Sequence, residues 1–158
     1  GQPAEEHSYE GWQKVMSLNV DVCFLMAQEV ARRFMIPRQS GKIINIASIA
    51  GFKGNRANSG IHTVAYNTSK AAAINLTRAL AGEWGPHNIN VNAICPGYFP
   101  TKMAKGLEKV TELIKSGTPL GRIGGEEDIK GVAVFLATEA SRHVTGQAIA
   151  VDGGNSVV

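Results

Sequence analysis

Cysteine is scarce in this sequence, and the two cysteines present, Cys23 and Cys95, stand 72 positions apart. Neither belongs to a Cys-x-x-Cys pair or to any other zinc-binding spacing. The four histidines form no His-Glu-x-x-His or similar motif, so we expect no dedicated metal site. Both cysteines have apolar neighbours, which favours two buried, reduced thiols in a cytoplasmic protein over a disulfide.

Long apolar runs and a strong excess of charge are also absent. The most apolar stretch, residues 20–34, is interrupted by charged and amide side chains, whereas a membrane span needs about 20 apolar residues. The first ten residues are polar and acidic, so we expect no secretion signal. The net charge is only +3 and the basic residues are scattered, which argues against a nucleic-acid partner. These absences together favour a cytoplasmic protein with neither membrane nor nucleic acid as a partner.

The composition, 44% apolar and 18% charged, is that of a soluble globular domain, and helix and strand patterns alternate along it. Helices between strands imply right-handed crossovers and a parallel sheet, so the predicted fold class is α/β. The first helix is apolar on most sides and should be buried or covered by a partner. We expect helices over residues 8–34, 62–84 and 126–136, strands over 42–47, 89–94 and 147–151, and a mobile, partly helical segment over 98–118.

Three residues in this pattern suit proton transfer. Open α/β sheets bind ligands at the carboxyl ends of their strands, and Ser48 follows the first expected strand. Tyr66 and Lys70 are four apart on the next helix and so share a face. A neighbouring ammonium favours a phenolate, and a serine hydroxyl can bind the same substrate oxygen, which suits a carbonyl or alcohol. Taken alone, the Tyr-x-x-x-Lys spacing arises by chance in many helices and is more often that of an ordinary helix surface.

Four stretches of sequence, in this order, favour the catalytic interpretation. They closely resemble motifs of the short-chain dehydrogenase/reductase family, and the resemblance runs from about residue 7 to 154. It implies the C-terminal portion of a Rossmann-like, doubly wound parallel sheet, with residues 1–158 as the catalytic part of a single domain. The stretches are Asn-Ile-Ala-Ser-Ile-Ala-Gly at 45–51, Tyr-Asn-Thr-Ser-Lys-Ala-Ala at 66–72, Asn-Val-Asn-Ala-Ile-Cys-Pro-Gly at 90–97, and Thr-Gly-Gln at 145–147 with Val-Asp-Gly-Gly at 151–154.

The same resemblance implies a role for each site residue. Ser48 would orient the substrate, Tyr66 would be the acid–base, and Asn19 would support a proton-relay water. Lys70 would assist the tyrosine and hold the nicotinamide ribose. The cofactor would be NAD or NADP. Its expected contacts, besides the tyrosine and the lysine, are Pro96, Gly97, Phe99 and Thr101, the last near the carboxamide and phosphates.

Two features depart from the family pattern. Ser48 and Tyr66 are 18 positions apart, farther than in many members, because of an insertion around residues 54–62 beside the expected substrate pocket. No glycine-rich dinucleotide loop opens a helix, and the residue that chooses between NAD and NADP is missing with it. We therefore expect the chain to be the carboxyl-terminal three fifths of such an enzyme.

The implied reaction interconverts a secondary alcohol and a ketone, with a sugar acid, a polyol or a similar small carbonyl compound as substrate. One alternative is a 3-oxoacyl-carrier-protein reductase, whose carrier docking favours basic residues where this chain has Gln39, beside Arg38, and His87. An alternative of another class is a non-catalytic fragment that only associates through its long helices. Family members commonly form homotetramers through these helices, here 8–34 and 62–84. The segment 98–118 would be a lid over the site, or else a plain pair of surface helices.

Overall fold

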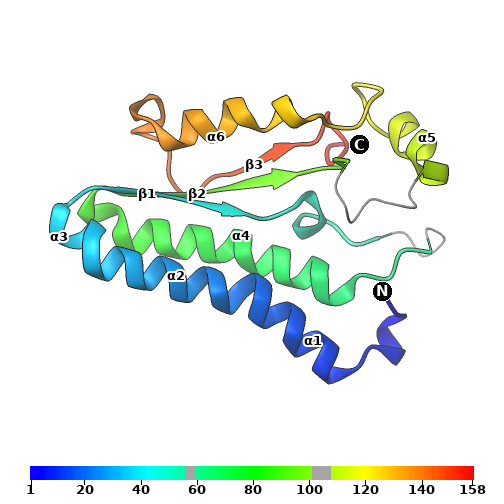
Figure 1. Ribbon diagram of the computed structural model, residues 1–158, viewed down its shortest axis with the longest axis horizontal. Helices are drawn as coiled ribbons and strands as arrows, with labels where there is room; N and C mark the ends of the chain where they lie inside the picture. Colours follow the sequence, from blue (N-terminus) through cyan, green and yellow to red (C-terminus); the bar gives the residue numbers. More distant parts are fainter. Residues whose placement is uncertain (56–59, 101–107) are drawn as a thin grey trace.

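The computed structural model describes residues 1–55, 60–100 and 108–158. These residues contain a three-stranded sheet with the order β1-β2-β3, and both strand pairs are parallel. Helices cover both faces of the sheet (Figure 1). The α/β class and the parallel sheet are therefore confirmed. The strands are β1 (Gly41–Ile46), β2 (Ile89–Pro96) and β3 (Ala148–Val151).

The central strand β2 is held to the chain before β3 by its polar side chains as well as by its backbone. Asn92 Oδ1 accepts a hydrogen bond from the Gln147 N–H at 3.0 Å, and Asn92 Nδ2 donates to the Val144 carbonyl at 2.9 Å. The Asn92 side chain is buried, and an unpaired amide there would be costly. The Asn-Val-Asn motif thus fixes where β3 begins, and with it the carboxyl edge of the sheet.

The first helix begins as predicted, with the Ser8 hydroxyl accepting a hydrogen bond from the Gly11 N–H at 3.1 Å. It was expected to end near Phe34, before Pro37, and this was wrong, because the helix continues to Arg38. A π turn precedes the proline, which then falls in the first turn of a new α-helical segment, where its missing N–H costs little. The helical segments are α1 (Tyr9–Met16), α2 (Val22–Val30) and α3 (Ile36–Arg38), joined by π turns over Ser17–Asp21 and Ala31–Met35.

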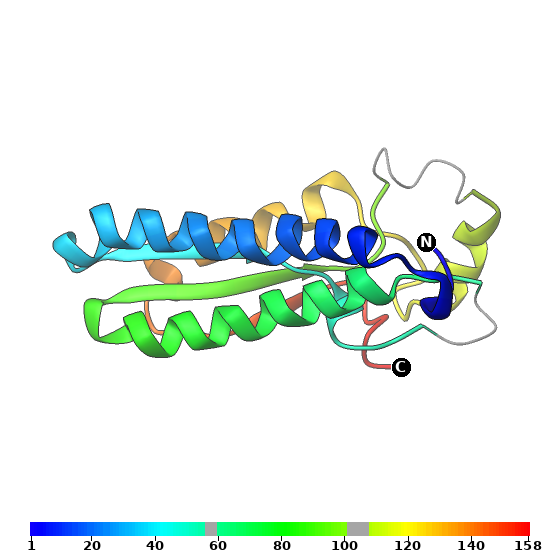
Figure 2. The ribbon, with the colours of Figure 1, turned by 90° about the horizontal axis from the view of Figure 1, so that it is seen from below.

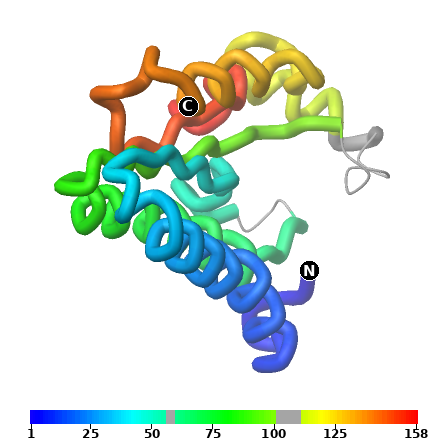
Figure 3. Tube along the Cα trace, turned by 60° about the vertical axis from the view of Figure 1, so that its left-hand side comes forward, coloured from blue at the N-terminus to red at the C-terminus, as the bar shows by residue number. Residues whose placement is uncertain are grey.

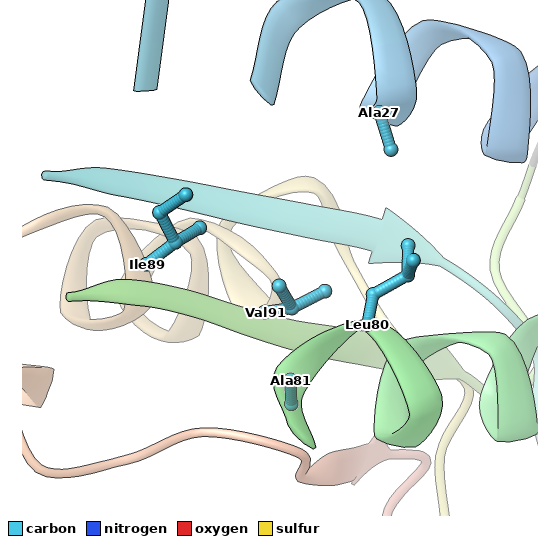
Figure 4. Close-up of a cluster of buried hydrophobic side chains, with 5 residues drawn as sticks. All are labelled: Ala27, Leu80, Ala81, Ile89 and Val91. Atoms are coloured by element: carbon cyan, nitrogen blue, oxygen red, sulfur yellow. The ribbon is translucent and has the colours of Figure 1, made fainter. Parts of the chain in front are cut away.

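Helix α4 (Val64–Trp84) lies beside this first helix on one face of the sheet (Figures 2 and 3). Small side chains let the two helices and the strands approach closely. One buried cluster joins the first helix, α4 and β2 and is drawn in Figure 4; it contains Ala27, Leu80, Ala81, Ile89 and Val91. A second cluster lies nearer the carboxyl ends of the strands and contains Ala47, Ala73, Ile74, Ala93 and Cys95.

Helix α6 (Lys130–Ala137) covers the opposite face of the sheet (Figure 1). It was expected to begin at Glu126, and this was wrong, because residues Glu126–Asp128 form a 3₁₀ turn. The Asp128 carboxylate accepts the Gly125 N–H and binds the Arg122 guanidinium through both oxygens. These bonds hold the acidic segment in a separate turn ahead of the helix.

The two crossovers have opposite hands. The step from β1 to β2 and the step from β2 to β3 go in the same direction, but α4 and α6 lie on opposite faces (Figures 1 and 2). Right-handed crossovers were predicted for both connections. The first is right-handed, whereas the second is left-handed, so the prediction was wrong for the second. The second connection spans residues 97–147 and includes α5 (Glu108–Ser116), so it is not the compact unit to which the handedness rule applies.

The outer face of the first helix remains apolar and exposed. Leu18, Leu25 and Met26 are 67%, 54% and 61% exposed, and of this helix only Ala27 and Ala31 are fully buried. Of the two expectations for this helix, burial within a single copy of the chain is wrong, because one stripe faces α4 while the other has no neighbour among the described residues. Cover by a partner stays a prediction. Within residues 1–55, 60–100 and 108–158, the structure contains no helix with the length and apolar character of a membrane span.

Candidate active site

The carboxyl ends of the three parallel strands meet at one edge of the sheet, on the right in Figure 1. Ser48 follows β1 at this edge and is mostly buried, with 9% of its surface exposed. Its Oγ accepts a hydrogen bond from the Ala50 N–H at 3.1 Å, which opens a 3₁₀ turn over Ile49–Gly51. Because Oγ is the acceptor in this bond, the hydroxyl proton of Ser48 is available to another oxygen.

Gly51 brings the Ser48 turn directly against α4. A Cβ atom at this position would lie 2.7 Å from the carbonyl carbon of Lys70 and 2.8 Å from the nitrogen of Ala71. Both atoms belong to helix backbone, which cannot move aside without bending the helix. Glycine is therefore required here for the serine turn and the lysine to lie against each other.

Tyr66 and Lys70 lie in the first turns of α4 and share a face, as the spacing predicts. The Lys70 ammonium is 5.6 Å from the centre of the Tyr66 ring and donates a hydrogen bond to the Ile46 carbonyl at 2.9 Å. Burial lowers the pKa of Lys70, and interaction with Cys23 and Cys95 offsets part of that change. The cation is thus placed between the phenol ring and the end of β1.

Asn19 is connected to the turn of α4 between Tyr66 and Lys70 through Ser69, a residue to which the sequence analysis gave no role. It lies in the π turn Ser17–Asp21, and its Nδ2 donates a hydrogen bond to Ser69 Oγ at 3.0 Å. Ser69 in turn donates to the Tyr66 carbonyl at 2.8 Å and is completely buried. A signal for it existed in the sequence, because a serine in a helix interior often bonds to a carbonyl of the preceding turn.

The expected cofactor segment follows β2. Pro96 ends the strand, and the Gly97 N–H donates to the Val151 carbonyl at 3.0 Å. A Cβ atom at Gly97 would lie 2.6 Å from Cβ of Asp152, so only glycine allows the two chain segments to approach this closely. Thr101 lies outside the described residues.

Phe99 lines a cavity of about 470 Å³ between the turn at residues 119–128 and the chain after β3. A second cavity, of about 590 Å³, lies between the turn at 50–55, residues 61–64 and the Asn67 side of α4. Neither cavity is lined by Ser48, Tyr66 or Lys70. The second cavity borders the described ends of the insertion, and just ahead of the insertion the Lys53 carbonyl accepts a hydrogen bond from Asn67 Nδ2 at 2.8 Å.

Both cysteines are free thiols, as expected, although Cys23 is only partly buried. Burial raises the pKa of Cys95 to about 11, and the backbone N–H of Ser48 and the Lys70 ammonium offset part of that rise. Cys95 is therefore an uncharged thiol between the serine and the lysine. Among the described residues, no three His, Cys, Asp or Glu side chains gather in a group able to hold a metal.

Residues 1–156 match the family model described as enoyl-(acyl carrier protein) reductase. The chain belongs to the short-chain dehydrogenase/reductase family. This confirms the resemblance that the motifs indicated.

Among curated members of the short-chain dehydrogenase/reductase family, the chain is 47% identical to 2-dehydro-3-deoxy-D-gluconate 5-dehydrogenase of Dickeya dadantii, over 96% of the chain and 59% of that protein. It is 43% identical to gluconate 5-dehydrogenase of Gluconobacter oxydans, over 98% of the chain and 59% of that protein. A solved structure of a gluconate 5-dehydrogenase from Burkholderia cenocepacia, in complex with NADP and tartrate, superposes with a TM-score of 0.91 at 34% identity. That match covers 99% of this chain and 60% of the other. The chain thus spans about three fifths of the length of these relatives.

Proposed function

We propose that this chain is the catalytic part of a single-domain NAD(P)-dependent oxidoreductase that interconverts a secondary alcohol and a ketone on a sugar acid or polyol. The observation that carries the proposal is the Lys70 ammonium, 5.6 Å from the Tyr66 ring, at the strand edge that Ser48 also occupies. The names of the relatives, gluconate and 2-dehydro-3-deoxy-D-gluconate 5-dehydrogenases, support the substrate class.

In this mechanism the phenol of Tyr66 gives a proton to the substrate oxygen, or takes it away when the alcohol is oxidised. The Lys70 cation stabilises the phenolate that remains. The Ser48 hydroxyl, whose oxygen is already held by the Ala50 N–H, donates its proton to the same substrate oxygen and so orients the carbonyl. Asn19, joined to the tyrosine turn through Ser69, supports the water that restores the proton.

The residues at the strand edge fit the nicotinamide end of the cofactor, which supplies the hydride when bound. An ammonium has three donors, and the Ile46 carbonyl takes one donor of Lys70, which leaves donors for ribose hydroxyls. Gly97 has no side chain of its own, and its N–H is hydrogen-bonded to the Val151 carbonyl at the end of β3. Because these 158 residues contain no glycine-rich loop, the pyrophosphate and adenine contacts are assigned to the part of the relatives that this chain does not cover.

A carrier-protein substrate is the second candidate, because the chain is also 39% identical to a 3-oxoacyl-[acyl-carrier-protein] reductase of Aquifex aeolicus. The two positions where carrier docking favours basic residues hold Gln39 and His87, and these side chains contact each other at 3.0 Å. Because Gln39 is uncharged and is hydrogen-bonded to His87, these two positions present no strong positive patch to an acidic carrier. A sugar acid is therefore favoured as the substrate.

The proposal includes a homotetramer. The exposed residues Leu18, Leu25 and Met26 belong to the first helix, which lies on the same side of the sheet as α4, so a second copy could cover both helices together. If the long helices served only for association, the chain would assemble but the complete protein would have no dehydrogenase activity. Light scattering on a sizing column separates a tetramer from a monomer independently of activity.

The deciding experiment uses the complete protein that contains this chain. We expect gluconate-dependent reduction of NAD or NADP, and reduction of an acetoacetyl thioester at a much lower kcat/KM. Preference for the thioester would favour the carrier-protein alternative. No turnover of either substrate by a folded protein that binds nicotinamide cofactor would overturn the proposal. The isolated 158-residue chain should bind neither cofactor in a calorimetric titration.

A further inference from the structure

Ser69 occupies the helical turn that separates the two residues proposed for acid–base work. Ser69 is completely buried, and its hydroxyl makes two hydrogen bonds, one as donor and one as acceptor. The hydroxyl donates to the Tyr66 carbonyl at 2.8 Å and accepts from Asn19 Nδ2 at 3.0 Å. A buried hydroxyl bonded in this way is fixed in one orientation, because turning it would break both bonds.

The carbonyl that Ser69 binds is part of the backbone between Tyr66 and Lys70. In an α-helix the carbonyl of residue 66 also accepts the N–H of residue 70. A second donor on such a carbonyl tilts the peptide and bends the turn slightly. The relative placement of the phenol and the ammonium, 5.6 Å from nitrogen to ring centre, is thus coupled to the serine hydroxyl.

The other partner of Ser69 lies where the first helix changes its pitch. Asn19 is the middle residue of the π turn Ser17–Asp21, in which the N–H of Val22 bonds to the carbonyl of Ser17. π turns are uncommon and are found at functional sites more often than elsewhere. The bond from Asn19 therefore ties this widened turn to α4 at the level of the proposed site.

We propose that Ser69 is a positioning residue, which fixes the Tyr66–Lys70 turn against Asn19 so that phenol, ammonium and relay water keep their relative places. This inference rests on the proposed function of Tyr66 and Lys70. It assigns Ser69 no contact with substrate or cofactor. Displacements of about 1 Å at a reacting centre can cost up to about 100-fold in rate, so a buried link of this kind has a measurable effect.

The same helix offers a matched control. Thr77, two turns further along α4, is completely buried, donates to the Ala73 carbonyl at 2.9 Å and accepts from Asn45 Nδ2 at 2.9 Å. Its two bonds are of the same kind as those of Ser69, but they lie away from Tyr66 and Lys70. Loss of either hydroxyl leaves one side-chain amide short of a partner, the partly buried Asn19 in one case and the buried Asn45 in the other, so the structural cost should be at least as large for Thr77 while the catalytic cost falls on Ser69.

The experiment compares Ser69→Ala with Thr77→Val in the complete, folded protein. We expect Ser69→Ala to lower kcat by about tenfold, with the substrate KM changed by less than about twofold. It should also move the acidic limb of the alcohol-oxidation profile to higher pH, because the cation stabilises the phenolate less well. Thr77→Val should lower the melting temperature and leave kcat and the profile unchanged. Ser69→Thr, which keeps the hydroxyl, should restore most of the turnover.

A double-mutant comparison tests whether Ser69 acts through Asn19. The effect of Ser69→Ala on kcat should be smaller in an Asn19→Ala background than in the wild type, because the link is already broken. Wild-type kcat and pH profile in folded Ser69→Ala, or equal effects in both backgrounds, would overturn the inference.

If Ser69→Ala does not fold, Ser69→Thr with a tenfold loss of kcat at wild-type stability would overturn it as well. Tyr66→Phe separates the two hypotheses: full activity in that variant removes the proposed function itself, whereas a large loss there with no effect of Ser69→Ala removes only this inference.

Discussion

The ammonium of Lys70 faces the ring of Tyr66 at 5.6 Å and at the same time donates a 2.9 Å hydrogen bond to the carbonyl of Ile46. The first contact belongs to the chemistry proposed for the site, and the second is structural, since it joins α4 to the end of β1. One side chain therefore serves both the charge of the site and its alignment. Substitutions at these two residues should consequently give different kinetic patterns.

Tyr66→Phe removes the proton carrier and keeps the ring. In the complete protein we expect kcat to fall by at least about 100-fold because the proton carrier is lost, and cofactor affinity to fall much less, because Tyr66 loses only its own contact with the cofactor. Steady-state kinetics and a fluorescence titration with the reduced cofactor measure both quantities. Turnover within about threefold of wild type in a correctly folded variant would exclude Tyr66 from the acid–base role.

Lys70→Met removes the cation and keeps most of the side-chain length. Cofactor binding and turnover should both weaken, because the ribose contact and the stabilisation of the phenolate are lost together. The acidic limb of the alcohol-oxidation profile should move to higher pH, since a phenolate without a neighbouring cation forms less readily. A profile that stays in place would leave Lys70 with only its alignment role at the Ile46 carbonyl.

Gly51→Ala tests whether the close approach of the serine turn to α4 matters for the site. The added Cβ would meet backbone atoms of Lys70 and Ala71, so we expect a loss of about 1–3 kcal/mol in unfolding free energy and a lower kcat. Gly82→Ala is the control, because its Cβ would meet nothing within 4 Å and the residue is exposed in the last turn of α4. That change should stabilise the protein by up to about 1 kcal/mol and leave kcat unchanged. Urea unfolding and kinetics on the same preparations compare the two variants.

Asp128→Asn should change how stability depends on acid. Hydrogen bonds from the Arg122 guanidinium, and then from the Gly125 N–H, hold the pKa of Asp128 well below its usual range. A carboxyl whose pKa is lowered on folding stabilises the fold above the unfolded value of about 3.9, and this contribution is lost as the pH falls further. The wild type should therefore lose more stability between neutral and acidic pH than the variant does. Equal losses in urea unfolding at the two pH values would contradict the role of this ion pair.

The elements that are easy to predict are those whose pattern depends on local sequence. β2 is apolar and bounded by Asn88 and Gly97, and α4 has a helical period that by itself places Tyr66 and Lys70 on one face. Both were expected within two residues of the observed bounds. The sequence also indicated Ser48 at a strand end, because the carboxyl ends of parallel strands meet at one edge.

The features that escaped prediction depend on contacts between distant residues. The passage of the first helix through Pro37 requires a π turn, which no local propensity indicates. The late start of α6 depends on Asp128 bonding to Gly125 and Arg122 rather than continuing the helix. The link from Asn19 to Ser69 depends on how the first helix and α4 are rotated against each other, which the sequence of neither helix reveals. The roles of Asn19, Ser48, Tyr66, Lys70, Pro96, Gly97, Phe99 and Thr101 stay predictions.

Among the described residues β1 pairs only with β2, and Ile46 at its end is 53% exposed. The free side of β1 offers unpaired backbone groups at the spacing of one further parallel strand. Such an edge accepts a strand from a separate polypeptide as well as one joined covalently. The domain should therefore tolerate division ahead of this chain, and co-expression with a polypeptide carrying the remaining strands should reconstitute a working enzyme by complementation in trans. When the chain is expressed alone, the free side of β1 should pair with further copies of the chain and promote self-association.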